Sequence, residues 1–361
     1  MNGFSEKIFL SLKMPTEDVP VSDKTRILLA LEALGYEQVS MPLSILQTLY
    51  PLCRKADFDI TVTLVHREAD WVITKVESGD TTGSHYGLAV DYGSTTIVME
   101  LIDLNSGSVI DQVQAVNGQT VYGTDILSRI TYVMENPSHA DHMQQVTVRT
   151  FSSLLAQLTE NTGIEAGNCP IMILSGNTTM IHFLLKLDAW TVFASPYAPV
   201  VSDPGFFWGK ELGMTFSGLV YIIPAASNYI GGDIVSGLLK LDMHKKDAPS
   251  LFFDIGTNGE LVIGNRDWMM AGAGAAGPAL EGYISRYGMR ATEGAIDSVT
   301  IHRSKLTFTT IGQKKPVGIC GSGIIDLIAQ MRLNGWINIA GELNPAASPR
   351  ILWLEEEGQY A

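Results

Sequence analysis

YGLAVDYGSTTIVMELIDL, residues 86–104, and SLFFDIGTNGELVIGN, residues 250–265, are the stretches that decide the fold of this chain. In each, an apolar run ends at an aspartate, Asp91 or Asp254, and the chain returns through Gly with Ser, Thr or Asn into a second apolar run. This pattern predicts a β-hairpin with a tight turn. Because it occurs twice in separate parts of the chain, it predicts two related lobes that face each other across a nucleotide.

The turns of both hairpins carry groups that suit phosphate and Mg²⁺. Backbone N–H groups and hydroxyls of a tight turn can cradle phosphate oxygens, and a carboxylate can hold Mg²⁺ through its water ligands. We therefore predict that Asp91 and Asp254 are catalytic and hold Mg²⁺ through water at facing strand ends. The predicted phosphate contacts are Gly93, Ser94, Thr95, Thr96, Gly256, Thr257, Asn258 and Gly259. The alternative is that both aspartates only cap their turns, where Asp is common.

The composition is that of a folded α/β protein. Apolar residues make up 46% of the 361 residues and charged residues 17%, with 35 glycines, which suits packed strands and turns rather than disorder. The formal net charge of −14 argues against a nucleic-acid partner, since a phosphate backbone is bound by basic faces. No apolar run reaches the ~18–20 residues of a membrane span, and residues 1–15 lack a signal-peptide layout, so we expect a cytoplasmic protein without membrane contact.

The cysteines exclude several kinds of site on this chain alone. Cys53, Cys169 and Cys320 lie far apart in the sequence, and their spacing fits neither a disulfide framework nor a zinc site. An iron–sulfur cluster needs four ligands with close spacing, so we expect no cluster here.

The order of apolar runs and breakers predicts three domains. Residues 1–83 form a small α+β domain with a hairpin of two strands, residues 84–232 the first lobe, and residues 233–361 a connecting helix and a partial second lobe. In the first lobe we expect helices over 122–136 and 142–161. A buried strand near 171–176 is followed by a helix that Thr178 or Thr179 opens.

Six blocks of sequence resemble the ATPase part of the reductive activators of corrinoid proteins, which belong to the actin/hexokinase/Hsp70-type superfamily. They are GLAVDYGSTT (87–96), YGTDILSRI (122–130), ILSGNTTMIHFLL (173–185), DIGTNGE (254–260), AGAAGPALEG (273–282) with GMRATEGAI (288–296), and GICGSGIIDLIA (318–329). The resemblance implies an actin-like, ribonuclease H-like two-lobed α/β fold that binds ATP and Mg²⁺. It also implies a corrinoid protein or a corrinoid-dependent methyltransferase as partner, whose Co(II) is reduced to Co(I).

Two parts of the family pattern are missing from these 361 residues. The family carries an N-terminal [2Fe–2S] domain with four cysteines, and its ATPase part ends with a Gly-rich adenosine-binding loop. We therefore expect an external electron donor, an incomplete second lobe and weak ATP binding. Whether the chain forms a homodimer stays open.

Two alternative functions stay open as well. One is a non-catalytic module that holds the corrinoid protein. The other is a small-molecule kinase of the same fold, for which Asp233 is the candidate base. Further residues that could line the nucleotide cleft are Asn177, Asp233, Glu260, Gly321 and Ser322.

Five residues in the blocks also have purely structural interpretations. Asp125 and Arg129 lie four residues apart on one predicted helix, which favours a surface ion pair. His182 has no second histidine nearby and is predicted to be a core or interface residue rather than a ligand. Asn177 could occupy a left-handed turn position. Cys320, between two glycines, is predicted to be an inert small residue in a tight loop.

Overall fold

The structure is a computed structural model, which describes residues 3–123, 125–256, 258–274, 285–302 and 305–360. The chain divides into two compact units, Met1–Asp242 and Met243–Ala361, and each is described by itself. In the part of the chain that the structure describes, no helix is both long and apolar enough to cross a membrane.

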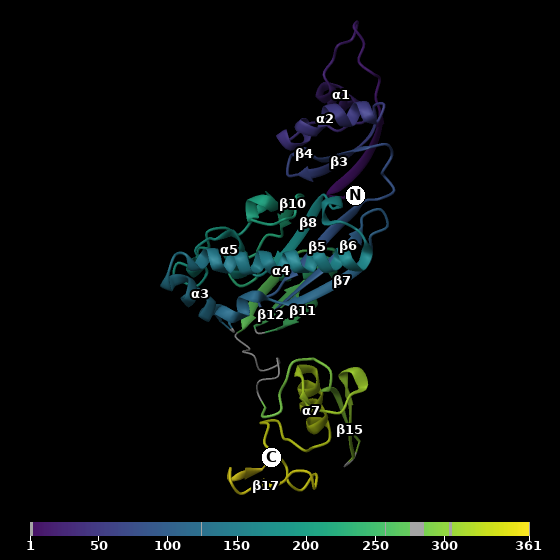
Figure 1. The fold of residues 1–361 in the computed structure, drawn as a ribbon. Helices are drawn as coiled ribbons and strands as arrows, with labels where there is room; N and C mark the ends of the chain where they lie inside the picture. Colours follow the sequence, from purple (N-terminus) through teal and green to yellow (C-terminus); the bar gives the residue numbers. More distant parts are fainter. Residues whose placement is uncertain (1–2, 124, 257, 275–284, 303–304, 361) are drawn as a thin grey trace. The chain divides into compact units, whose positions relative to one another are not determined.

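The first unit begins with a small α+β domain (Figure 1). Its sheet has the strand order β1-β3-β4-β2, and β3 and β4 form the predicted antiparallel hairpin. Its core is closed by Ile27 and Leu31 of α1, both fully buried against β-sheet residues such as Ile60. The N-cap of α1 is Ser22, which accepts a hydrogen bond from the Thr25 N–H. The elements are β1 (Ser5–Ser11), α1 (Asp23–Ala33), β2 (Val39–Ser40), α2 (Leu43–Lys55), β3 (Asp59–Arg67) and β4 (Asp70–Ser78).

The remainder of the first unit contains a six-stranded sheet of order β7-β6-β5-β8-β10-β9. The central strands β5, β8 and β10 run parallel, and β6, β7 and β9 each pair antiparallel with a neighbour. This is the ribonuclease H-like arrangement of the predicted first lobe. The strands are β5 (Tyr86–Tyr92), β6 (Thr96–Asp103), β7 (Ser108–Val116), β8 (Ile171–Gly176), β9 (Gly205–Trp208) and β10 (Leu219–Ile222).

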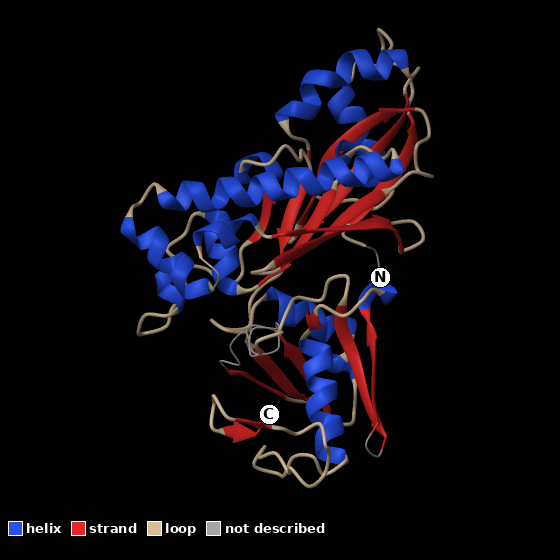
Figure 2. Cartoon of the chain, turned by 60° about the horizontal axis from the view of Figure 1, so that its bottom comes forward, coloured by secondary structure: helices blue, strands red, loops and turns tan. Residues whose placement is uncertain are grey.

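The long helix α4 (His139–Thr162) runs across this sheet (Figure 1), and Figure 2 shows it as the long blue helix over the red strands. Its buried side chains repeat at helical spacing and join the main core, as Leu154, Leu155 and Leu158 predicted. The other helical elements are η1 (Gly118–Tyr122), α3 (Ile126–Glu135), η2 (Ala166–Asn168), α5 (Thr178–Leu185), η3 (Ala189–Val192), η4 (Gly209–Leu212) and α6 (Gly232–Lys240).

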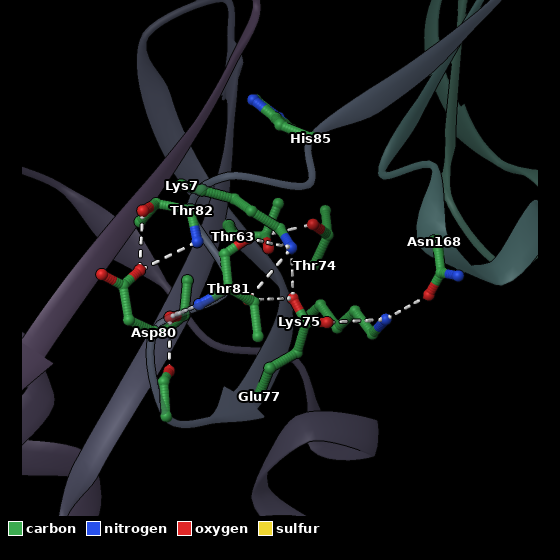
Figure 3. A network of polar contacts seen from close by, with 12 residues as sticks. Lys7, Thr63, Thr74, Lys75, Glu77, Asp80, Thr81, Thr82, His85 and Asn168 are labelled. Atoms are coloured by element: carbon green, nitrogen blue, oxygen red, sulfur yellow. Dashed lines mark hydrogen bonds and ion pairs between the residues drawn. The ribbon is translucent and has the colours of Figure 1, made fainter. Parts of the chain in front are cut away.

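The small domain and the lobe share a core and a polar network within the first unit. Val65 and Val72 of the small domain pack with Ile171 and Leu219 of the lobe. Figure 3 shows the polar network, which Lys75 extends to the lobe by a hydrogen bond of 2.8 Å to Asn168. Two lysines bind Glu77 there, Lys7 at 2.7 Å and Lys75 at 3.1 Å. Although burial opposes this, the two lysines lower the pKa of Glu77.

His85 lies where the small domain joins the lobe. It is buried and its Nε2 lies 2.9 Å from the hydroxyl of Ser5. Burial, together with the positive charge of Lys7, lowers the pKa of His85 to about 4. The ring is therefore neutral at physiological pH.

In its described residues, the second unit contains two three-stranded sheets, a two-stranded sheet of β17 and β18, and one longer helix. β11, β12 and β13 form an antiparallel meander, and β14 pairs antiparallel with β15 as predicted and parallel with β16. Asp326 of α7 accepts hydrogen bonds from Ser298 and Val299 and so joins α7 to β14. The elements are η5 (Met243–Lys245), β11 (Ser250–Ile255), β12 (Gly259–Gly264), β13 (Met269–Gly274), β14 (Ala295–His302), β15 (Lys305–Thr310), η7 (Ile311–Gln313), β16 (Gly318–Ile319), α7 (Gly321–Leu333), β17 (Trp353–Leu354) and β18 (Gln359–Tyr360).

Candidate nucleotide site

The first candidate turn joins β5 to β6. Asp91, the penultimate residue of β5, stands opposite Val98 on β6 and Ser175 on β8. The predicted phosphate contacts Gly93, Ser94 and Thr95 form the turn itself, and Thr96 begins β6. A Cβ on Gly93 would lie 2.5 Å from the carbonyl oxygen of Thr96. Only glycine fits there, so the backbone of the turn stays close-packed.

Asn117 anchors this turn, and the sequence analysis missed it. Its side-chain amide donates to the carbonyl of Gly93 at 2.8 Å, and its backbone N–H donates to the carbonyl of Thr95 at 2.8 Å. Asn117 is fully buried and also caps η1 by accepting from the Gln119 N–H. The sequence signal was Asn followed by Gly118, which indicates a turn but not the strand end that Asn117 contacts.

The second part of the site is the end of β8. Asn177, expected in the cleft, is the N-cap of α5, and its Oδ1 accepts from the Met180 N–H at 2.9 Å. The helix begins at Thr178, as predicted, but its cap is Asn177, and both threonines are buried in the first turn. The left-handed interpretation of Asn177 is wrong, because its φ of −70° and ψ of 159° are extended.

The third part is the beginning of α6, which lies directly against the end of β8. A Cβ on Gly231 would lie 2.5 Å from the Cα of Asn177, and one on Gly232 would lie 2.6 Å from the carbonyl oxygen of Ile223. Asp233 follows in the first turn of α6, where its Oδ1 accepts from the Ile234 N–H at 2.9 Å. These glycines allow the close approach that places Asp233 at the carboxyl end of β8.

These three parts meet at the carboxyl ends of two adjacent parallel strands, β5 and β8. Ser175, opposite Asp91 in the ladder, lies 2.9 Å from the hydroxyl of Ser236 on α6. The structure thus brings together the Asp91 strand end, the 93–96 turn, Asn177 and Asp233. Ligands of open α/β sheets bind in this position, and the N-termini of α5 and α6 add partial positive charge.

The second unit carries the other predicted turn. Asp254 on β11 stands opposite Glu260 on β12, and the Gly256 N–H donates to the carbonyl of Asn258 at 2.9 Å. Gly259 begins β12, and the predicted contact Thr257 lies outside the described residues. Asp91 and Asp254 belong to different units, so their facing each other stays a prediction.

The candidate residues Gly321 and Ser322 lie at the beginning of α7. Cys320 is the N-cap position of that helix and is buried, with its sulfur 3.2 Å from the hydroxyl of Ser322. Whether Glu260, Gly321 and Ser322 contact a nucleotide also stays a prediction.

The predicted surface ion pair between Asp125 and Arg129 is wrong. Asp125 caps α3 and accepts from the backbone N–H and the hydroxyl of Ser128, at 2.9 and 2.6 Å, and these bonds lower its pKa. Arg129 is fully buried and donates to the carbonyl of Gly123 at 2.9 Å. Asp125 and Arg129 are four residues apart, as predicted, but Arg129 lies on the side of α3 that faces the core.

The prediction that His182 is a core residue is confirmed. Its ring is fully buried, with Nδ1 2.7 Å from the carbonyl of Thr178, and Nε2 accepts from the Val200 N–H at 3.2 Å. Burial lowers its pKa, so the neutral ring serves as a structural link.

The cysteines do not come together in the described parts of the chain. Cys53, Cys169 and Cys320 are each buried and free, and burial raises the pKa of Cys169 to about 12. Among the residues that can be described, no three side chains of the His, Cys, Asp and Glu types form a group that could hold a metal ion.

The first lobe, with its ribonuclease H-like sheet and its glycine-rich turns at the strand ends, has the fold of the actin-like ATPases. Comparison with protein families narrows this class. Residues 1–83 match the RACo linker region, residues 86–246 the RACo middle region, and residues 248–361 the C-terminal domain of RACo, the ASKHA domain. The chain belongs to the RACo family.

Relatives with curated names are similar over most of the chain. A corrinoid activation enzyme, RamQ, of Eubacterium limosum is 33% identical over 268 residues, which are 74% of this chain and 45% of the relative. A [Co(II) methylated amine-specific corrinoid protein] reductase of Methanosarcina barkeri is 27% identical over 59% of this chain and 40% of its own length. The chain therefore spans less than half the length of these two relatives.

A solved structure is similar over nearly the whole chain. The structure of a reductive activator for corrinoid, iron-sulfur protein aligns with a TM-score of 0.87 and 35% identity. The alignment covers 98% of this chain and 57% of the other.

Proposed function

We propose that this chain is the ATP-dependent part of a reductive activator of a corrinoid protein. It binds ATP, and hydrolysis supports the reduction of the partner's cobalt from Co(II) to Co(I). The observation that carries the proposal is the TM-score of 0.87 over 98% of the chain to a reductive activator. The meeting of Asp91, the 93–96 turn and the beginning of α6 at the carboxyl ends of β5 and β8 supports the proposal.

Each part of the candidate site has a role in ATP hydrolysis. The backbone N–H groups of the turns at 93–95 and 256–258 stabilise the charge that develops on the transferred phosphoryl group. Asp91 and Asp254 would hold Mg²⁺ through water, and the ion would neutralise phosphate charge. The anchor at Asn117 keeps the first turn in one conformation, so that its donors need no rearrangement during the reaction.

Reduction of Co(II) to Co(I) consumes one electron, which ATP hydrolysis does not supply. We propose that an external donor provides it, since the three cysteines of these 361 residues are buried and separate. The energy of the nucleotide then acts on protein conformation: it favours a state of the complex in which the cobalt accepts the electron.

The first test is hydrolysis by the Asp254→Ala variant. Loss of one preorganised group that stabilises charge typically costs about 10²–10³ in rate, and we expect a decrease of at least about a hundredfold in kcat. The control is Asp267→Ala, because that side chain is 73% exposed on the same unit. Unchanged hydrolysis in Asp254→Ala would remove this residue from the mechanism.

The second test follows cobalt. The chain is mixed with a cobalamin-loaded corrinoid protein, ATP and a reductant, and the Co(II) and Co(I) absorption bands are recorded. We expect Co(I) only when ATP and reductant are both present. Complex formation without ATP hydrolysis would instead support the non-catalytic binding module. Hydrolysis that depends on a small hydroxylated substrate, and that is lost in Asp233→Asn, would support the kinase.

A further inference from the structure

A buried arginine of the first lobe, linked to the phosphate turn through Gln119, has no ion-pair partner among the described residues. Arg129 is 0% exposed, and its hydrogen-bond partners among the described residues are neutral: the Gly123 carbonyl at 2.9 Å, Gln119 Oε1 at 3.5 Å and the Met180 sulfur at 3.7 Å. Its Nη2 is buried and has no hydrogen-bond partner among the described residues. A buried guanidinium with neutral partners retains a large part of its desolvation penalty.

The carboxylate of Asp125 is close enough to attract Arg129 electrostatically but makes no ion pair with it. Asp125, one turn earlier, uses both carboxylate oxygens on Ser128, and in the described ranges no ion pair joins it to Arg129. Tyr92 lies nearby with its hydroxyl bonded within the core, and burial raises the pKa of that hydroxyl, so it stays neutral. Burial also lowers the pKa of Arg129, but a guanidinium keeps its proton in proteins.

Two routes of hydrogen bonds connect Arg129 to the phosphate turn, and both pass through Gln119. In the first, the Gln119 side chain donates to the hydroxyl of Tyr92, the residue directly before Gly93. In the second, the Gln119 N–H donates to Asn117, which in turn donates to the carbonyl of Gly93. Arg129, on α3, is therefore linked through Gln119 of η1 to the residues that support the turn.

We propose that Arg129 is a positioning residue whose counter-charge is the ligand: the phosphate chain of a nucleoside triphosphate at the 93–96 turn. Without ligand, the lone buried cation destabilises the lobe. An anion at the neighbouring turn compensates the charge, so Arg129 raises affinity without touching the ligand. This inference rests on the proposed function, because it requires that the turn binds phosphate.

The test uses the 361-residue chain and calorimetric titration with Mg·ATP. We expect Arg129→Met to bind ATP at least about tenfold more weakly, which corresponds to about 1.4 kcal/mol. Arg129→Lys keeps the charge and should bind within about threefold of the original chain. The control Arg149→Met removes an exposed positive charge of the same lobe and should leave affinity unchanged.

A second variant tests the charge without removing the arginine. Gln119→Glu places a carboxylate beside Arg129, and the hydroxyls of Tyr92 and Thr147, which now accept from Gln119, can rotate to donate to it. We expect its unfolding temperature without ligand to equal or exceed that of the original chain, while ATP affinity falls about tenfold. A purely structural arginine would gain the same stability and keep its affinity.

The outcomes separate this inference from the proposed function. If the original chain binds ATP and both Arg129→Met and Gln119→Glu bind it equally well, the inference is wrong and the proposed function stands. Arg129→Lys binding as weakly as Arg129→Met would show that shape rather than charge matters, and would also overturn the inference. If the original chain binds neither Mg·ATP nor pyrophosphate, the proposed function itself fails, and the inference with it.

Discussion

Replacing Gly93 with alanine should distort the turn between β5 and β6. The added Cβ would lie 2.5 Å from the carbonyl oxygen of Thr96, and because this atom belongs to the backbone, no side-chain rotation relieves the contact. Asn117 restrains the turn at Gly93 and Thr95, so the strain cannot be released by a small movement of the turn alone. Overpacking of this kind typically costs about 1–3 kcal/mol, and we expect the free energy of unfolding to fall by ~2 kcal/mol.

The measurement is urea unfolding followed by circular dichroism, together with titration of Mg·ATP. Gly83→Ala is the matched control, because a Cβ there has nothing within 4 Å and the φ is not left-handed. That variant should be as stable as the original chain, or more stable by up to about 1 kcal/mol, since alanine restricts the unfolded chain. We expect Gly93→Ala to lose ATP affinity and Gly83→Ala to keep it. A Gly93→Ala protein with unchanged stability would refute the close approach on which the turn's rigidity depends.

Three further predictions concern the frame around the site. The pKa of His85 is lowered to about 4, so its neutral ring contributes stability above the unfolded-state pKa of about 6.5, and this contribution is lost as the pH falls toward 4. Between pH 7 and 5 the free energy of unfolding of the original chain should fall by ~2 kcal/mol more than that of His85→Gln. Equal pH profiles of stability would contradict the buried neutral ring. Asn177→Ala removes the cap of α5 and should cost about 1 kcal/mol in urea unfolding, while Asn177→Ser should restore most of it, because serine also caps. Phe151→Ala empties a fully buried position beside Tyr92 and should cost about 3–5 kcal/mol; a loss below 1 kcal/mol would show that the core there can collapse.

Much of the architecture could be predicted because local signals agreed with the packing. The runs at 86–104 and 250–265 form hairpins with their aspartates near the strand ends, since alternating apolar residues and a Gly-containing turn favour that shape whatever surrounds them. The leucines at 154, 155 and 158 lie on the buried face of α4, because helical spacing places them on one stripe.

The errors occurred where a polar residue serves a distant part of the chain. Asn117 holds a turn 24 residues earlier in the sequence. The local Asn-Gly pattern does not indicate which distant residue Asn117 contacts. Arg129 is identified by its spacing as one half of a surface pair, but the neighbouring Met180 and Gln119 show it to be inside the lobe. Asn177 and Thr178 are both good caps by residue type, and the backbone angles decide between them.

The sequence by itself determined the class of the chain, the two hairpins with Asp91 and Asp254, and the family resemblance, because these depend on short-range periodicity and on motifs that are contiguous. Only the tertiary structure decided which polar groups support the phosphate turn. Burial and hydrogen-bond geometry depend on the packing of segments that are far apart in the sequence. This packing makes Asn117 an anchor of the turn and Arg129 a buried cation without an ion-pair partner among the described residues.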